Sequence, residues 1–368
     1  MGVSELLARY AVRRAHVLLV EVPGSWSLRV AVERQVLARG WQLAEAPADA
    51  DVLVVCGLPG PELGELVERV WDQLPGPRVR LDLSRVEALD GGLDGALDTV
   101  AAELADTASH REDARQRSAA PDSAAAAADD AEMDHADMDH GDMDHGDMDM
   151  APHGIPLAEG GQDRDGLEMD VLHVPLGPIL RHWPAGLVLR CAVQGDVVVE
   201  AQASVLPGGQ GATHDATVPV GALLCDHVAA LLSLAGWADG AASARTVRDA
   251  LLDGRPDEAT TPLLERLGHD VVRARLLRWS LRDVGKIDAN TIADKHLPEH
   301  LAGDVHGRLV GMLDRAMSGR QPEPAPDSAA LVDALPDLVT GMELAAVRLF
   351  VASLALDTTP TREQAAHA

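Results

Sequence analysis

Several residue types are scarce in this 368-residue chain, and each scarcity excludes a class of protein. There are only three cysteines, Cys56, Cys191 and Cys225, and they are far apart and form no CxxC pair. A disulfide framework is therefore not expected, and a four-cysteine iron–sulfur site cannot be built from this chain alone. Aromatic residues make up 2% of the chain, with Tyr10 and Phe350 the single members of their types. No run of about 20 apolar residues occurs, so no membrane span is expected.

Positive charge is scarce as well. The chain has 31 lysines and arginines against 59 aspartates and glutamates, which gives a net charge of −28. Nucleic acid is not expected as a partner, because binding to phosphates needs a basic face. The first residues, MGVSELLARYAVRR, lack the apolar core and cleavage site of a secretory signal. We expect a cytoplasmic protein that could reach a membrane only peripherally, through a partner.

The acidic residues are concentrated in the middle of the chain. Residues 101–150 carry 15 acidic and 3 basic side chains and include an alanine run at 124–128. Such a composition buries too little apolar surface to offset the entropy of ordering. We therefore predict a disordered acidic linker over residues 111–166, which separates two globular domains at 12–110 and 167–358.

Within this linker, a five-residue repeat runs from Glu132 to His153 and reads EMDHADMDHGDMDHGDMDMAPH. Imidazole suits copper, nickel and zinc, and thioether selects Cu(I). The repeat predicts several weak copper or nickel sites, unless it is an acidic spacer that carries its methionines and histidines by repeat expansion. The candidate ligands are Met133, His135, Met138, His140, Met143, His145, Met148, Met150 and His153.

Apolar runs and turns in the first domain alternate in the manner of an α/β fold. Continuous β-branched runs predict buried parallel strands at 16–22, 50–56 and 78–83. Helices are expected at 25–39, with Ser25 as its cap, at 62–73, and from the third strand to about residue 108. This order predicts a doubly wound parallel sheet, in which ligands bind beyond the carboxyl ends of the strands.

The last domain reads as α+β, mostly helical with a small antiparallel sheet. A strand is expected at 171–176, and a hairpin at 187–193 and 196–203 turns about Gln194-Gly195. Apolar residues then recur at three and four positions, which predicts helices. The expected helices are near 220–236, 241–253, 257–283, 290–318 and 328–356.

The stretch from Ala50 to Leu83, ADVLVVCGLPGPELGELVERVWDQLPGPRVRLDL, resembles the 20 kDa iron–sulfur subunit of respiratory complex I. That family is related to the small subunit of NiFe hydrogenases. In it, a Cys-Cys pair follows the first strand and another cysteine follows the third. Here the equivalent places read Val22-Pro23-Gly24-Ser25 and Leu83-Ser84, so the resemblance implies the fold without an iron–sulfur cluster.

The second domain resembles the complex I 49 kDa subunit, the relative of the NiFe hydrogenase large subunit. The resemblance begins at 171–202, VLHVPLGPILRHWPAGLVLRCAVQGDVVVEAQ, and continues through the helices, where Arg245, Arg248 and His269 are among the polar positions. The family's quinone pocket uses a histidine in the first hairpin loop and a tyrosine on the helical core. His182 could stand for that histidine, but no tyrosine follows Tyr10. The CxxC pairs that hold nickel and iron in hydrogenases are absent.

Other polar groups have alternative interpretations. His182 could equally be a turn histidine at the surface. Cys225-Asp226-His227 resembles a thiolate–imidazole pair, but adjacent helical residues point about 100° apart and no third group is evident. His214-Asp215 in a glycine-rich loop is similarly weak. A basic stretch with Trp279 near residues 273–282 forms either a solvated face or a partner contact.

Three hypotheses follow from the sequence. The first is a degenerate fusion of complex I or hydrogenase small-like and large-like subunits, which acts as a non-catalytic accessory, assembly or regulatory protein of a redox complex. Its partners would be redox-complex subunits, or its own two domains paired with each other. The second is a nickel- or copper-handling protein that uses the repeat. The third is a residual quinone-linked oxidoreductase subunit.

Overall fold

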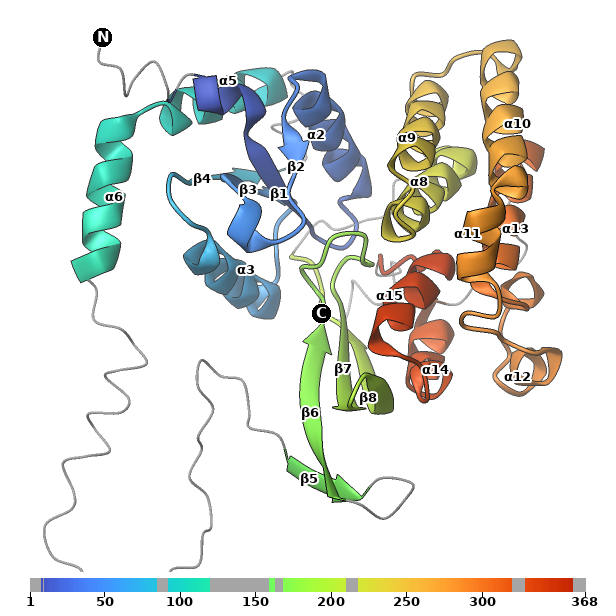
Figure 1. Ribbon diagram of the computed structural model, residues 1–368. Coiled ribbons are helices and arrows are strands. Elements are labelled where there is room, and N and C mark those ends of the chain that lie inside the picture. The colour runs from blue at the N-terminus through green and yellow to red at the C-terminus, as the bar shows by residue number, and fades with distance from the viewer. Residues whose placement is uncertain are drawn as a thin grey trace, which may run out of the picture.

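The computed structural model describes residues 8, 10–84, 92–119, 159–162, 168–209, 218–319 and 328–359. Figure 1 shows a parallel sheet with its helices in the N-terminal half, drawn in blue and teal, and a group of helices from yellow to red in the C-terminal half. The green antiparallel sheet lies between and below them.

The N-terminal half is built on four parallel strands in the order β2-β1-β3-β4. The strands are β1 (His16–Glu21), β2 (Gln42–Leu43), β3 (Val52–Cys56) and β4 (Val79–Leu83). The helices are α2 (Trp26–Ala38), α3 (Pro61–Gln73), α5 (Gly92–Leu104) and α6 (Thr107–Ala119), with short 3-10 turns η1 (Val12–Arg14) and η2 (Pro47–Asp49).

Helices cover both faces of this sheet, as a doubly wound fold requires. On one face, Leu28 and Val32 of α2 pack with Leu97 of α5. On the other face α3 packs through Leu63 and Val67. Every residue of the central strand β3 is buried, which explains its continuous β-branched run.

The sequence placed the three long strands and the first two helices within two residues of their observed bounds. It missed β2, which is only two residues long. It also assigned a cap to Ser25, whose side chain makes no capping hydrogen bond. The linker expected from residue 111 is helical as far as Ala119. Helix α6 buries no residue, and its ion pairs include Arg117–Asp113 at 3.0 Å. Apolar periodicity cannot detect such a helix.

The C-terminal half contains an antiparallel sheet in the order β5-β6-β7-β8. Its strands are β5 (Glu159–Gln162), β6 (Glu168–Leu176), β7 (Leu187–Gln194) and β8 (Val197–Val205). The expected hairpin is confirmed, and Gly195 supplies the left-handed residue of its turn with φ +61°. Strand β5 lies inside the segment that we expected to be linker.

The helices of this half form two apolar clusters, one against the sheet and one within the helical group. They are α8 (Val220–Leu234), α9 (Ala238–Leu252), α10 (Asp257–Arg273), α11 (Arg275–Leu281), α12 (Ala289–Asp294), η4 (Glu299–Leu301), α13 (Val305–Ser318), α14 (Ser328–Val339) and α15 (Leu344–Ser353). In the part of the chain that the structure describes, none of them is long and apolar enough to cross a membrane.

Three of the expected long helices are broken, and local chemistry accounts for the breaks. The helix expected at 257–283 divides at Ala274, whose ψ is 88°. The helix expected at 290–318 falls into three pieces. Asp288 caps the first of them, α12, and Asp304 starts a new helix at α13, each by accepting a backbone N–H bond at 2.8 Å. The last one is interrupted before α15 near Gly341, which has φ +84°.

Candidate functional site

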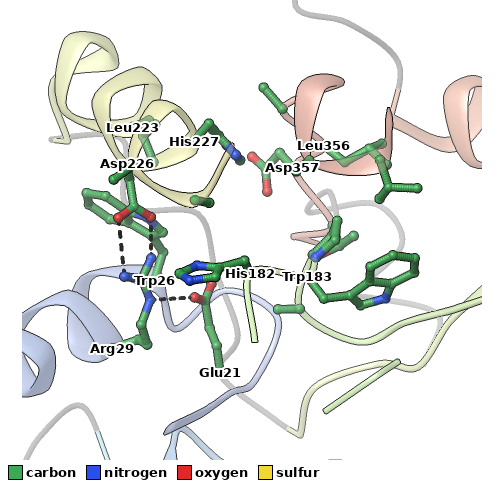
Figure 2. A pocket seen from close by; sticks show the side chains of 18 of the residues that line it. Glu21, Trp26, Arg29, His182, Trp183, Leu223, Asp226, His227, Leu356 and Asp357 are labelled. Carbon is green, nitrogen blue, oxygen red and sulfur yellow. Dashed lines mark hydrogen bonds and ion pairs between the residues drawn. The ribbon is translucent and has the colours of Figure 1, made fainter. Parts of the chain in front are cut away.

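A cavity of about 390 Å³ lies between the two halves of the chain. The N-terminal half contributes β1 and the start of α2, and the C-terminal half contributes the loop at 178–185, helices α8, α13 and α15, and residues 354–359. Most of its lining is apolar, with a few polar side chains directed inward (Figure 2). This volume and this lining are typical of small-molecule sites.

His182 enters the cavity from the loop between β6 and β7. Its backbone has φ +60°, a left-handed conformation that is unusual for a residue other than glycine. Its Nε2 atom is buried and has no hydrogen-bond partner. Burial, reinforced by the charge of Arg181, lowers the pKa of His182 to about 3, so the imidazole is neutral at ordinary pH and can donate or accept one bond.

Beside His182, a cluster of ion pairs crosses from α2 to the helices of the C-terminal half. Arg29 binds Asp226 of α8 and lies 2.8 Å from Glu33 of its own helix. Arg248 of α9 binds the same two carboxylates, at 2.8 Å from Glu33 and 2.6 Å from Asp226. The indole of Trp26 donates to Asp226 at 2.8 Å. Two cations thus share two carboxylates across the interface.

The charges in this cluster stabilise one another. Burial alone would raise the pKa of Asp226, but Arg29 and Arg248 outweigh it and hold that pKa far below its usual range. Burial would lower the pKa of Arg29, whereas Asp226, Glu21 and Glu33 raise it well above its usual range. At Glu21, burial outweighs the attraction of Arg29, and the pKa is raised. Asp226, Arg29 and Arg248 therefore stay charged, whereas Glu21, which Arg29 contacts at 2.8 Å, has a carboxyl pKa above its usual range.

Further contacts join the two halves of the chain. Arg34 of α2 lies 2.7 Å from Asp253 at the end of α9. The backbone N–H of Gly209 donates to the carbonyl of Leu58 at 2.7 Å. Val188 of β7 belongs to the same apolar cluster as the α3 side of the parallel sheet. The two halves therefore share a core as well as ion pairs.

At another part of the cavity wall, α8, α13 and η4 contribute basic side chains. Burial lowers the pKa of His300 to about 4 and also lowers that of His227, with a smaller contribution from Arg315 at both. Figure 2 shows His227 facing Asp357. Arg315 has a buried Nε without a hydrogen-bond partner, and burial lowers the pKa of its guanidinium.

The strand ends that would carry cluster cysteines in the resembled family are packed directly against one another. The N–H of Val22 donates to Cys56 at 3.0 Å, and that of Gly57 donates to Leu83 at 2.9 Å. A Cβ placed on Gly57 would lie 2.1 Å from the Oγ of Ser25. Cys56 is fully buried, and burial raises the pKa of its thiol. These residues do not fit an iron–sulfur cluster, which needs several thiolate ligands around an open space.

The other candidates from the sequence lie elsewhere or have different partners. Cys225 is fully buried, burial raises the pKa of its thiol to about 12, and its neighbour Asp226 is held by arginines, so the pair is not arranged as a nucleophile. His269 is exposed on α10. Trp279 is 77% exposed on α11, where the basic stretch forms a solvent-facing surface. Residues His214 and Asp215 lie outside the described residues.

The whole Met/Asp/His repeat also lies outside the described residues. Among the residues that the structure does describe, no group of three or more histidine, cysteine or carboxylate side chains could hold a metal ion. The expectation that the repeat binds copper or nickel therefore stays a prediction from sequence.

Sequence reasoning singled out His182, Arg245 and Arg248, but it missed Arg29 and Glu33. The signal for these two was present, since a charged pair at i and i+4 interrupts the otherwise apolar helix segment SLRVAVERQV. A buried carboxylate in such a segment requires a partner. Glu33 has Arg29 as a partner in its own helix, but its second partner, Arg248, is 215 positions away and only the fold identifies it.

Comparisons with protein-family models, with curated proteins and with solved structures each gave no match.

Proposed function

We propose that this protein is a non-catalytic relative of the small-subunit and large-subunit pair of complex I and NiFe hydrogenases. In this proposal the two halves are fused in one chain and closed on a cavity that binds a small molecule. The protein would act as an accessory, assembly or regulatory component of a redox complex. The observation that supports it best is the ion cluster of Arg29, Glu33, Asp226 and Arg248, which borders the cavity.

The cluster supports a stable pairing of the halves because buried charges are tolerated only with partners. Glu33 is 5% exposed and Arg248 is 1% exposed. Separating the halves would leave Glu33 without Arg248 and Asp226 without Arg29. The loss of one partner from a buried pair costs about 3–5 kcal/mol. The buried ion pairs therefore favour the closed interface between the halves, as a fused pair of subunits would require.

A non-catalytic role is supported by the residues at the strand ends. In the resembled family, cysteines at these positions hold the cluster that relays electrons. Here the positions carry Val22, Ser25 and Leu83, and the backbone at Gly57 is packed against the Ser25 side chain. The chain has kept the pairing surface and lost the ligands of the relay.

The pairing is tested by cutting the full-length protein at a protease site inserted between residues 120 and 158. The two fragments should remain together on gel filtration at moderate salt, because the ion cluster and the shared core hold them. The same cut in an R248M variant should release the fragments at a lower salt or denaturant concentration. Fragments that separate freely in the wild-type protein would contradict the proposal.

The accessory role is tested by purifying the full-length tagged protein at its native level and identifying co-purifying proteins by mass spectrometry. Subunits of a hydrogenase or of a complex I-type enzyme should be recovered in stoichiometric amounts. An iron–sulfur absorbance near 400 nm after anaerobic reconstitution would overturn the non-catalytic assignment.

A quinone-linked role is the second candidate, and His182 is the observation that favours it. Its neutral imidazole enters an apolar cavity with an unpaired buried nitrogen, which suits a carbonyl or hydroxyl group of a ligand. The tyrosine that pairs with this histidine in the resembled family has no counterpart. Binding of a short-chain quinone that is lost in H182N would support this role, and equal binding by both proteins would reject it.

A further inference from the structure

One cation in the wall of the cavity differs from the others in its ion pairs. Arg315 of α13 lines the cavity and has no ion pair among the described residues. Its Nε is buried and without a hydrogen-bond partner, and burial is the cause that lowers the pKa of its guanidinium. Arg29 and Arg248, in contrast, each contact two or more carboxylates. A partly buried charge is costly unless it is paired.

The groups around Arg315 do not supply that pairing. Burial lowers the pKa of both His227 and His300, and the charge of Arg315 adds a smaller lowering at each, so both imidazoles are neutral at ordinary pH. Asp357 faces His227 and acts to raise the pKa of that imidazole. The local environment is thus the positive charge of Arg315, two neutral hydrogen-bonding rings and the carboxylate of Asp357 beside His227.

We infer that the cavity binds an amphipathic monocarboxylate, with the carboxylate on Arg315 and the apolar body along the cavity wall. A guanidinium pairs with a carboxylate through two parallel hydrogen bonds, and the neutral imidazoles can donate to its remaining lone pairs. The apolar part of the lining includes Leu223, Leu331 and Leu354, which would cover the tail. This inference rests on the proposed closing of the two halves, and it adds the chemical class of the ligand.

A single negative charge fits better than two. Arg315 is the one cation in this part of the wall that is free of a carboxylate among the described residues, and Asp357 faces His227 nearby. Asp357 would repel any anion bound here, and its repulsion of a phosphate dianion would exceed its repulsion of a monocarboxylate. A carboxylate balances the guanidinium and adds no excess charge to a site of low dielectric constant.

The test uses the full-length protein and three probes with the same tail, decanoate, 1-decanol and decyl phosphate, in calorimetric titrations. Wild-type protein should bind decanoate more tightly than decanol. R315M removes the charge but keeps most of the side-chain length, and it should weaken decanoate binding on the order of 10-fold or more while it leaves decanol binding unchanged. R315K keeps the charge without the planar fork and should restore part of the affinity. R266M, at an exposed arginine of α10, is the matched control and should bind decanoate as the wild type does.

Thermal unfolding separates a binding defect from a folding defect. Because R315M removes an uncompensated charge from the cavity wall, the free variant should unfold at the same temperature as the wild type or a higher one. Decanoate should then raise the unfolding temperature of the wild type and not that of R315M. Fluorescence of Trp26 and Trp183, which line the cavity, gives a second measure of occupancy.

Three results would overturn the inference: equal decanoate affinity in R315M and wild type, tighter binding of decanol than of decanoate, or tighter binding of decyl phosphate than of decanoate. Each of them leaves the pairing of the halves intact if the protease-cut protein still migrates as one species. Separation of the cut halves would instead remove the cavity itself, so the two failures can be told apart.

Discussion

Glu33 of α2 and Arg248 of α9 are 215 positions apart in the sequence, and Arg248 Nη1 donates to Glu33 Oε2 at 2.8 Å in the interface between the halves. Arg248 is among the most deeply buried side chains of the chain. It also contacts Asp226 and Asp249 from its own half, so the N-terminal half supplies the third carboxylate around it. The fold of each half therefore depends electrostatically on the other.

Replacement of Arg248 by methionine should destabilise the whole chain. R248M would leave Glu33 and Asp226 with Arg29 as their main cation, and we expect the free energy of unfolding to fall by about 3 kcal/mol. Chemical denaturation measures this loss. R255M removes a 58% exposed side chain and should change the stability by less than about 0.5 kcal/mol. The double variant E33Q/R248M should recover part of the loss, and a loss below about 1 kcal/mol in R248M would contradict the assigned role of the cluster.

Stability should fall as the pH is lowered from about 7 towards 4. The pKa of His182 is lowered to about 3 and that of His300 to about 4, so the unfolded chain binds protons below the usual histidine pKa of 6.5 while the folded chain does not. Their contribution is therefore fully present above that usual pKa and is lost as the pH falls through the window. The lowered pKa of Asp226 acts only below about 4, where protonation would begin to weaken its ion pairs.

The measurement for this effect is denaturation at several pH values in wild type and in H182N. Asparagine accepts the left-handed backbone of residue 182, so the variant should fold. Its stability should decline less steeply between pH 7 and pH 4. H269N, at an exposed position of α10, controls for the loss of one imidazole. Identical slopes in H182N and wild type would show that His182 is not held neutral by the fold.

The parts of the fold that could be predicted from sequence are those in which the local environment of a position determines its residue type. The run at β3 is buried on both faces and therefore reads as continuously β-branched. The β7–β8 turn needs a left-handed residue, and Gly195 marks it. In contrast, α6 has no apolar stripe, and its composition therefore predicts linker from residue 111 onward.

The candidate site was harder to predict because its residues act in combination. His182 and Arg248 were both singled out through the resemblance, His182 as a pocket histidine and Arg248 as one of the polar positions of the helical core. Arg29 and Glu33 gained their significance only when the fold placed them against Asp226. Arg315 carries no sequence signal, since what distinguishes it is that no carboxylate forms an ion pair with it among the residues that the structure describes.

The Met/Asp/His repeat should account for any binding of copper or nickel by the full-length protein. Deletion of residues 132–153 should abolish the tight binding seen in calorimetric titrations with Cu(I) or Ni²⁺, because it removes the nine candidate thioether and imidazole ligands. A Gly/Ser replacement of the same length controls for the spacing between the halves. If metal binding survives in both variants, the ligands lie elsewhere. If growth under metal limitation and excess is also unchanged, the repeat has no physiological metal role.

Gly57, at the carboxyl end of β3, should resist substitution more than any open glycine of the same half. Its φ of +105° is a conformation that side chains disfavour, and an added Cβ would lie 2.1 Å from Ser25 Oγ and 3.0 Å from Val22 Cβ. We expect G57A to lower the free energy of unfolding by about 1–3 kcal/mol. G95A, in the interior of α5 with nothing within 4 Å of its added Cβ, should be neutral or stabilise the chain by up to about 1 kcal/mol. Chemical denaturation of both variants measures the difference. If G57A were as stable as G95A, the strand ends would have room to move apart, and the close packing that argues against a cluster at this edge would lose its support.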